Sequence, residues 1–175
     1  MSERTLPDSS EPREGPHRLN THHALFGLGM MLVVLGAFTA HEIQTVGGSV
    51  RVDEVRFAAS DDRQLSALLY TPDGVDAQHK APGILAVHGY FNSRETQSAF
   101  AIEFARRGYV VLALDQSGHG LSQPPAFGNG FGGPDALTYL RSLDTVDPDN
   151  IGLEGHSMGG WAILAAAQAN PDGYR

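Results

Sequence analysis

The hydrophobic and polar positions divide the chain into a polar start, one long apolar run and a stretch of short alternating segments. Residues 24–40, ALFGLGMMLVVLGAFTA, are seventeen consecutive positions without a charged or strongly polar side chain. As a helix this run spans about 26 Å, slightly short of a hydrocarbon core of about 30 Å. The pattern predicts a membrane anchor or the apolar region of a signal peptide, with a buried helix of a soluble protein as the remaining alternative.

The flanks of this run favour an uncleaved anchor. A cleaved signal needs small residues in an A-x-A-like site, whereas Phe38–Ala40 places a bulky ring where a small side chain is preferred. Arg4, Arg13 and Arg18 precede the run at short distance. The positive-inside rule therefore predicts a cytoplasmic N-terminal tail, with the rest of the chain outside the cytoplasm.

The N-terminal 23 residues mix Pro, Ser, Glu, Arg and His without periodicity, which predicts a disordered tail. The predicted organisation is this tail at 1–23, the anchor or signal at 24–40, a linker at 41–49 and a folded portion at 50–175.

From about Ser49 onward, β-rich and apolar runs alternate with helical patterns. The predicted strands are 52–58, 65–70, 83–88, 110–114 and 150–154, with helices after residues 92, 135 and 157. Asn92 followed by Glu95 is typical of a capping box, and that helix is expected to stop at Gly108. Residues 147–150 predict a turn into the last strand. The alternation predicts an α/β fold: a mainly parallel sheet with helices on both faces, opened by an antiparallel pair.

Composition narrows the function classes. A length of 175 residues suits roughly one domain. The formal charge of −8 argues against nucleic-acid binding, which depends on clustered Lys and Arg. With no cysteine, the chain has neither a disulfide framework nor a thiolate metal site, and cysteine usage leaves the compartment open.

The most informative motif is Gly155–Gly159, GHSMG, between the last predicted strand and a helix-forming run. This strand-to-helix setting is the one that a nucleophile elbow requires, with Ser157 on a sharp turn and glycines that allow close backbone approach. The alternative is a glycine-rich loop in which Ser157 only caps the following helix.

A serine nucleophile needs a histidine base and a carboxylate that orients it, and in this setting both follow the serine along the chain. The eighteen residues after Ser157 include one acidic residue, Asp172, and no histidine. The sequence therefore carries a predicted nucleophile without its base.

Three segments together resemble the α/β-hydrolase superfamily over about residues 50–175. They are the elbow, His88-Gly89-Tyr90 after the third strand, and 115–122, DQSGHGLS, after the fourth, which is similar to the family's D-x-x-G-x-G-x-S loop. The resemblance implies the front part of such a domain, ending after the nucleophile helix.

The resemblance also implies an oxyanion hole made of two backbone N–H groups. Met158, directly after the nucleophile, is expected to give one, and Tyr90 the other. Losing one such donor typically costs about 10²- to 10³-fold in rate. The backbone positions of both residues therefore matter more than their side chains.

Other polar residues near these motifs are interpreted as structural. His88 and His119 precede the serine, which is the wrong order for a triad base. His88 and His156 are instead expected to stabilise the turns through packing and hydrogen bonds. Asp115 is expected to hold the loop after its strand. The glycine-rich stretch 127–133 lacks the Gly-Lys-Ser/Thr of a phosphate loop and is interpreted as a flexible loop near the site.

Within the superfamily, the segment 146–152, VDPDNIG, and the opening at 61–72 are similar to dienelactone hydrolases and to the prolyl-oligopeptidase or serine-aminopeptidase branch. That similarity implies small-molecule ester, amide or peptide substrates.

The leading hypothesis is a membrane-anchored serine hydrolase, carboxylesterase-like or aminopeptidase-like, of which this chain is an N-terminal portion that is inactive alone. The alternative is a non-catalytic, membrane-tethered binding module on the same scaffold. A haloperoxidase or acyltransferase of similar fold is a third possibility. No cofactor and no metal are implied, because the serine mechanism needs none and no metal-ligand spacing occurs in the sequence.

Overall fold

The computed structural model describes residues 21–175, so most of the predicted tail lies outside the described residues. The described chain belongs to two compact units, one ending at Phe38 and the other running from Thr39 to Arg175.

Helix α1, Thr21–Thr45, contains the apolar run and extends beyond it at both ends. Its first turn includes residues 21–23 of the predicted disordered tail, and its last turn lies in the predicted linker. The helix continues past the apolar run because no helix breaker occurs before Gly47 and Gly48, which adopt φ of 66° and 85°. Its length and composition are sufficient to cross a membrane, which fits either a signal sequence or an anchor.

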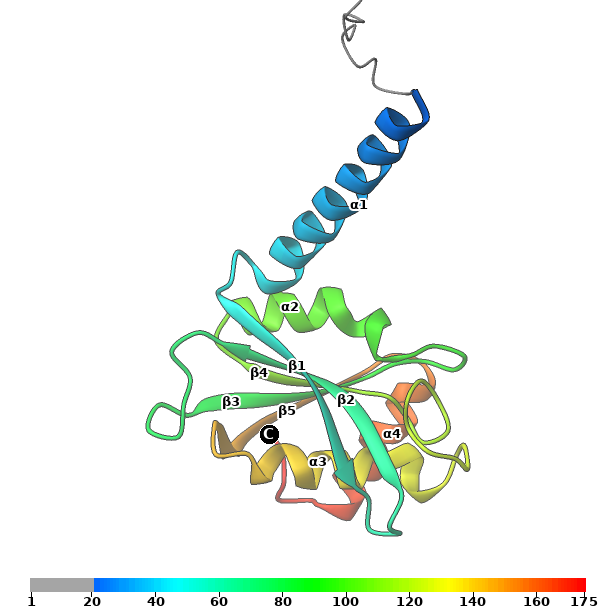
Figure 1. The fold of residues 1–175 in the computed structure, drawn as a ribbon. Coiled ribbons are helices and arrows are strands. Elements are labelled where there is room, and N and C mark those ends of the chain that lie inside the picture. Colours follow the sequence, from blue (N-terminus) through cyan, green and yellow to red (C-terminus); the bar gives the residue numbers. More distant parts are fainter. Residues whose placement is uncertain (1–20) are drawn as a thin grey trace, which may run out of the picture. The chain divides into compact units, whose positions relative to one another are not determined.

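The second unit contains a five-stranded mixed sheet with the order β1-β2-β4-β3-β5 (Figure 1). Strand β2 is antiparallel to both β1 and β4, whereas β3 is parallel to both β4 and β5. Parallel pairing is confined to β3, β4 and β5, where helical connections occur, and β2 pairs antiparallel on both sides. The sheet is therefore mixed, not mainly parallel as the sequence predicted. The strands are β1 Val50–Ala58, β2 Gln64–Pro72, β3 Ala81–Val87, β4 Val110–Leu114 and β5 Val146–Gly155.

Helices cover both faces of this sheet, as the alternating pattern predicted. Helix α2, Ser98–Arg106, lies on one face, and α3, Gly133–Ser142, and α4, Met158–Ala169, lie on the other (Figure 1). Two short 3₁₀ helices, η1 Arg94–Gln97 and η2 Asn129–Gly132, precede α2 and α3.

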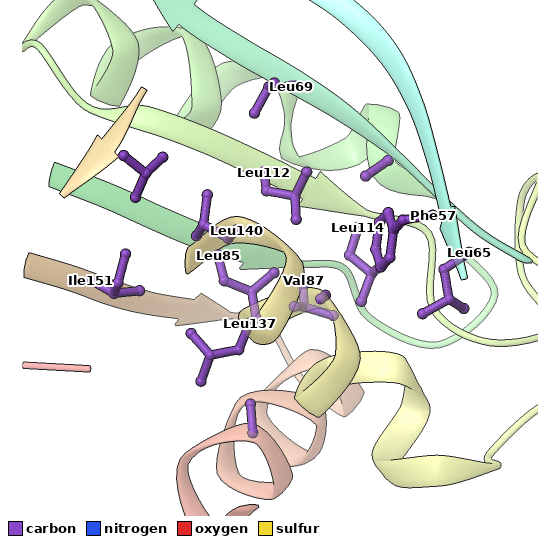
Figure 2. Close-up of a cluster of buried hydrophobic side chains, with 14 of the residues drawn as sticks. Phe57, Leu65, Leu69, Leu85, Val87, Leu112, Leu114, Leu137, Leu140 and Ile151 are labelled. Atoms are coloured by element: carbon purple, nitrogen blue, oxygen red, sulfur yellow. The ribbon is translucent and has the colours of Figure 1, made fainter. Parts of the chain in front are cut away.

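The larger core lies between the sheet and helices α3 and α4. Figure 2 shows Leu85, Leu112 and Leu114 of the central strands beside Leu137 and Leu140 of α3, and all five side chains are fully buried. A smaller cluster fills the space under α2. Both faces of β3 and β4 are therefore covered, which explains why their sequences are continuously apolar rather than alternating.

Two local predictions need correction. The prediction of a capping box at Asn92 is wrong. The N-cap residue of η1 is Ser93, whose side chain bonds to the Glu95 carboxylate and makes no capping hydrogen bond. The turn predicted at 147–150 instead lies within β5 as an irregularity, because Pro82 pairs with Asp147 and the next residue of β3 pairs with Ile151.

Candidate active site

Ser157 lies at the sharp turn between β5 and α4. Its backbone has φ 53° and ψ −115°, a conformation that is rare for a residue with a side chain, and the residue is exposed. Strained backbone of this kind persists only where the surroundings hold it, and it is concentrated at functional sites. The turn thus presents a serine hydroxyl to solvent at the carboxyl end of the sheet.

The glycines of the motif are needed because three backbone segments meet there. A Cβ on Gly155 would lie 2.5 Å from the carbonyl oxygen of Gly159, and a Cβ on Gly159 would lie 2.1 Å from that of Val87. Both distances are far below van der Waals contact. The His156 N–H also donates to the Val87 carbonyl at 3.1 Å. These contacts fix the elbow against the end of β3.

The loop after β3 lies directly beside the elbow. A Cβ on Gly89 would be 3.4 Å from the Cβ of Ser157, and Tyr90 is the next residue. Within residues 21–175, the backbone N–H groups of Tyr90 and Met158 donate to no protein acceptor. The fold therefore brings together the three residues that the sequence analysis selected: Ser157, Tyr90 and Met158.

His88 is a structural residue. It is fully buried, its Nδ1 lies 2.7 Å from the Gly89 carbonyl, and its Nε2 accepts the Gln116 N–H at 3.1 Å. This pattern requires the neutral tautomer protonated on Nδ1. Burial lowers the pKa of the imidazole, which keeps it neutral. Because both ring nitrogens are engaged, His88 has no free position for taking the serine proton.

Asp115 connects the loop after β4 to the loop after β3. Its buried carboxylate accepts the backbone N–H of Arg94 at 2.8 Å and that of Leu121 at 3.0 Å. A Cβ on Gly120 would overlap this carboxylate at 2.2 Å, so the glycine is required for the loop to close around it. Asp115 thus holds the loop, as the sequence predicted.

Arg94 is an important residue that the sequence analysis missed. Its buried guanidinium bonds to Glu54 at 2.8 Å and to the Ser66 hydroxyl at 2.6 Å, and its Nε lies 3.6 Å from Asp115. The hydrogen bond from Arg94 is the main reason that the pKa of Glu54 is lowered, with Arg56 contributing further. Glu54, Ser66 and Asp115 are separated from Arg94 by 21 to 40 positions, so no local pattern reveals the cluster.

Glu154, three residues before Ser157, is a second group that the sequence analysis missed. Burial raises the pKa of its carboxyl, and its Oε2 is buried without a hydrogen-bond donor among the described residues. The neighbouring His156 is exposed and partly opposes the shift.

None of the described histidines hydrogen-bonds to the Ser157 hydroxyl.

Known proteins are similar to this chain in sequence. The chain is 32% identical over 123 residues to the quorum-quenching protein AidA of Acinetobacter baumannii, covering 62% of this chain and 37% of that protein. It is 35% identical over 97 residues to the human mitochondrial palmitoyl-protein thioesterase ABHD10, covering 53% of this chain and 31% of that protein. The chain thus spans less than half the length of these relatives.

The fold is shared with solved structures. A bacterial heroin esterase superposes with a TM-score of 0.59 at 24% identity, over 71% of this chain and 41% of that one. An acetyl xylan esterase from Paenibacillus sp. R4 superposes with a TM-score of 0.60 at 23% identity, over 71% and 46% of the two chains. A sequence profile described as the alpha/beta hydrolase fold matches residues 82–173, more than half of the chain. The chain therefore belongs to the α/β-hydrolase family.

Proposed function

We propose that this chain carries the nucleophile and oxyanion hole of a serine hydrolase that forms an acyl-enzyme on Ser157. The observation that carries the proposal is the backbone of Ser157, a non-glycine residue held at φ 53° between β5 and α4, with the loop after β3 beside it. A serine that merely capped α4 would not need this conformation, and its side chain makes no capping hydrogen bond.

The reaction proceeds in two steps. The Ser157 Oγ attacks the substrate carbonyl, and the negative charge on the carbonyl oxygen is stabilised by the N–H groups of Tyr90 and Met158. Met158 is the first residue of α4, so the positive end of the helix dipole points to the same place. The bond to the leaving group then breaks, and water later hydrolyses the acyl-enzyme.

The serine proton must pass to a general base and from there to the leaving group. Residues 158–175 contain no histidine, and His88 is engaged on both ring nitrogens. Because the base follows the serine in this fold, we expect the base of the proposed mechanism outside the described residues 21–175. Neither a cofactor nor a metal is required.

The proposed substrates are small-molecule esters, thioesters, amides or peptides. Relatives of this chain include proteins named as a palmitoyl-protein thioesterase and as dipeptidyl peptidase 8, the latter 28% identical over 136 residues. All of these bonds break through the same acyl-enzyme chemistry. The elbow and the loop after β3 are compatible with each of these bonds, since selectivity among substrates comes from pocket residues around the carbonyl.

We further propose that α1 is retained as a single-pass anchor, with the hydrolase portion outside the cytoplasm. Sequencing the N-terminus of the mature membrane-bound protein tests retention: a terminus near residue 40 would identify a cleaved signal and a secreted enzyme instead. Alkaline phosphatase is active only outside the cytoplasm. When it is fused after the hydrolase portion, it should therefore be active if that portion is exported as proposed.

The test of Ser157 uses the full-length gene product and a fluorophosphonate probe. We expect labelling of the natural protein, loss of labelling in Ser157→Ala, and unchanged labelling in Ser142→Ala, an exposed serine of α3. Hydrolysis of an activated ester should fall by about 10⁴-fold or more in Ser157→Ala. A folded natural protein that is neither labelled nor active would favour the non-catalytic binding module, and persistent labelling of Ser157→Ala would refute the assignment.

A further inference from the structure

The loops around Ser157 carry a continuous group of aromatic rings, here called the aromatic rim. The ring centroids are 3.8 Å apart for Tyr90 and Phe91, 5.9 Å for Tyr90 and Phe127, and 5.9 Å for Phe127 and Phe131. His119 contacts this group edge-on, 6.0 Å from Tyr90. The rim joins the loop after β3 to the long loop between β4 and α3.

Much of the aromatic rim is exposed. Tyr90 is 46% exposed, Phe91 83% and Phe127 54%, and Leu121 of the long loop is 51% exposed. Single exposed apolar residues are common on proteins, but a contiguous exposed group beside a reactive residue is a sign of a binding surface.

The backbone that carries these rings is strained. Phe91, Phe127 and Phe131 have φ of 59°, 64° and 59°, in the left-handed region that bulky side chains rarely occupy. Such backbone conformations are energetically costly, and residues that adopt them gather at ligand-binding sites. Three phenylalanines at positions where glycine would be easier indicate that the rings themselves are required.

The same loops carry no charge. Residues 88–93 and 116–133 contain no Asp, Glu, Lys or Arg. The cation that supports the long loop, Arg63, donates to the Pro125 carbonyl at 3.0 Å and is neutralised by Asp61. A charged substrate group would therefore find no partner on the rim, whereas an apolar group could cover it.

We propose that the aromatic rim binds an apolar chain or ring of an uncharged substrate, next to the carbonyl that Ser157 attacks. The inference rests on the proposed function. The carbonyl oxygen is held by the backbone N–H of Tyr90, so a substituent of that carbonyl starts within reach of the Tyr90 ring and continues toward Phe91 and Phe127. The occupant is thus fixed by the position of the bond to be cleaved.

The test compares short and long substrates of the full-length gene product. One arm varies the acyl side, p-nitrophenyl acetate against p-nitrophenyl octanoate, and the other varies the alcohol side, ethyl acetate against octyl acetate. We expect kcat/KM to favour the octyl group by about tenfold or more in one arm, since each buried methylene contributes about 0.8 kcal/mol, a factor of about four. The arm that shows the preference identifies the side of the substrate that lies on the rim.

The variants Phe91→Ala and Phe127→Ala should lower kcat/KM for the preferred long ester about tenfold more than for the short ester. Phe100→Ala is the matched control, because Phe100 is 55% exposed but belongs to α2. Replacing the terminal methyl of the long chain by a carboxylate should remove the preference.

Equal rates on short and long esters in both arms would overturn the inference. So would an equal loss on both substrates in Phe127→Ala, the result expected if the rim packs against another part of the protein. The proposed function fails differently, through activity that survives in Ser157→Ala.

Discussion

Gly159→Ala tests the geometry of the elbow through the stability of the folded protein. The added Cβ would lie 2.1 Å from the Val87 carbonyl oxygen and 2.7 Å from that of His88. Neither atom can rotate away, because both belong to the backbone, and Val87 is paired with strands on both sides. Overpacking a core usually costs about 1–3 kcal/mol. Because a rigid backbone is displaced here, we expect a loss of about 3 kcal/mol or more in the free energy of unfolding.

Gly160→Ala is the matched control, one residue further along the same helix. A Cβ at Gly160 would meet nothing within 4 Å, and alanine is favoured over glycine in helices by about 0.5–1 kcal/mol. Urea unfolding of the full-length protein should therefore show opposite signs for the two variants, with fluorophosphonate labelling lost only in Gly159→Ala. Equal stability of the two variants would refute the close approach of α4 to β3.

Two further predictions concern buried charges. Arg94→Met should destabilise the protein by about 3–5 kcal/mol in urea unfolding, because it leaves the buried Asp115 carboxylate without its cation. The control Arg106→Met removes an exposed ion pair and should cost about 1 kcal/mol or less. Glu154→Gln should stabilise the protein at pH 8 more than at pH 4. Burial raises the pKa of the Glu154 carboxyl, so the neutral carboxyl is tolerated at low pH and the charged carboxylate destabilises the folded state as the pH rises through the folded-state pKa. The uncharged Gln avoids this loss. An equal gain from Glu154→Gln at both pH values would contradict the effect of burial.

The strands and helices were predictable because each has a strong local pattern. The continuous apolar run of β4, for example, is typical of a strand that is covered on both faces. The start of the η1–α2 segment was missed because Asn92, Ser93 and Glu95 all suit a helix start, and local propensity does not choose among them. The extent of α1 was missed because helix propensity continues where apolarity ends.

The candidate site was predictable only in its sequence-local parts. The elbow and the His88-Gly89-Tyr90 turn are short motifs whose residue types follow from backbone approach, so they can be recognised in sequence. The role of Arg94 depends on Glu54, Ser66 and Asp115, which come from three other segments. The aromatic rim likewise depends on a fold that brings residues 90–91 beside residue 127.

The position of the proposed donor Tyr90 is determined from both ends of its loop. Before it, Val87 accepts the N–H of His156, and Gly89 lies against Ser157. After it, the Arg94 N–H is bonded to Asp115, whose strand end also bonds to His88 through Gln116. A buried ion pair adds little net stability when compared with apolar residues, so the value of Arg94 and Asp115 lies in where they hold the backbone. An oxyanion donor acts through such prior orientation, because a group already in place needs no rearrangement as charge develops. The polar cluster beneath the loop is therefore as much a part of the proposed site as the serine.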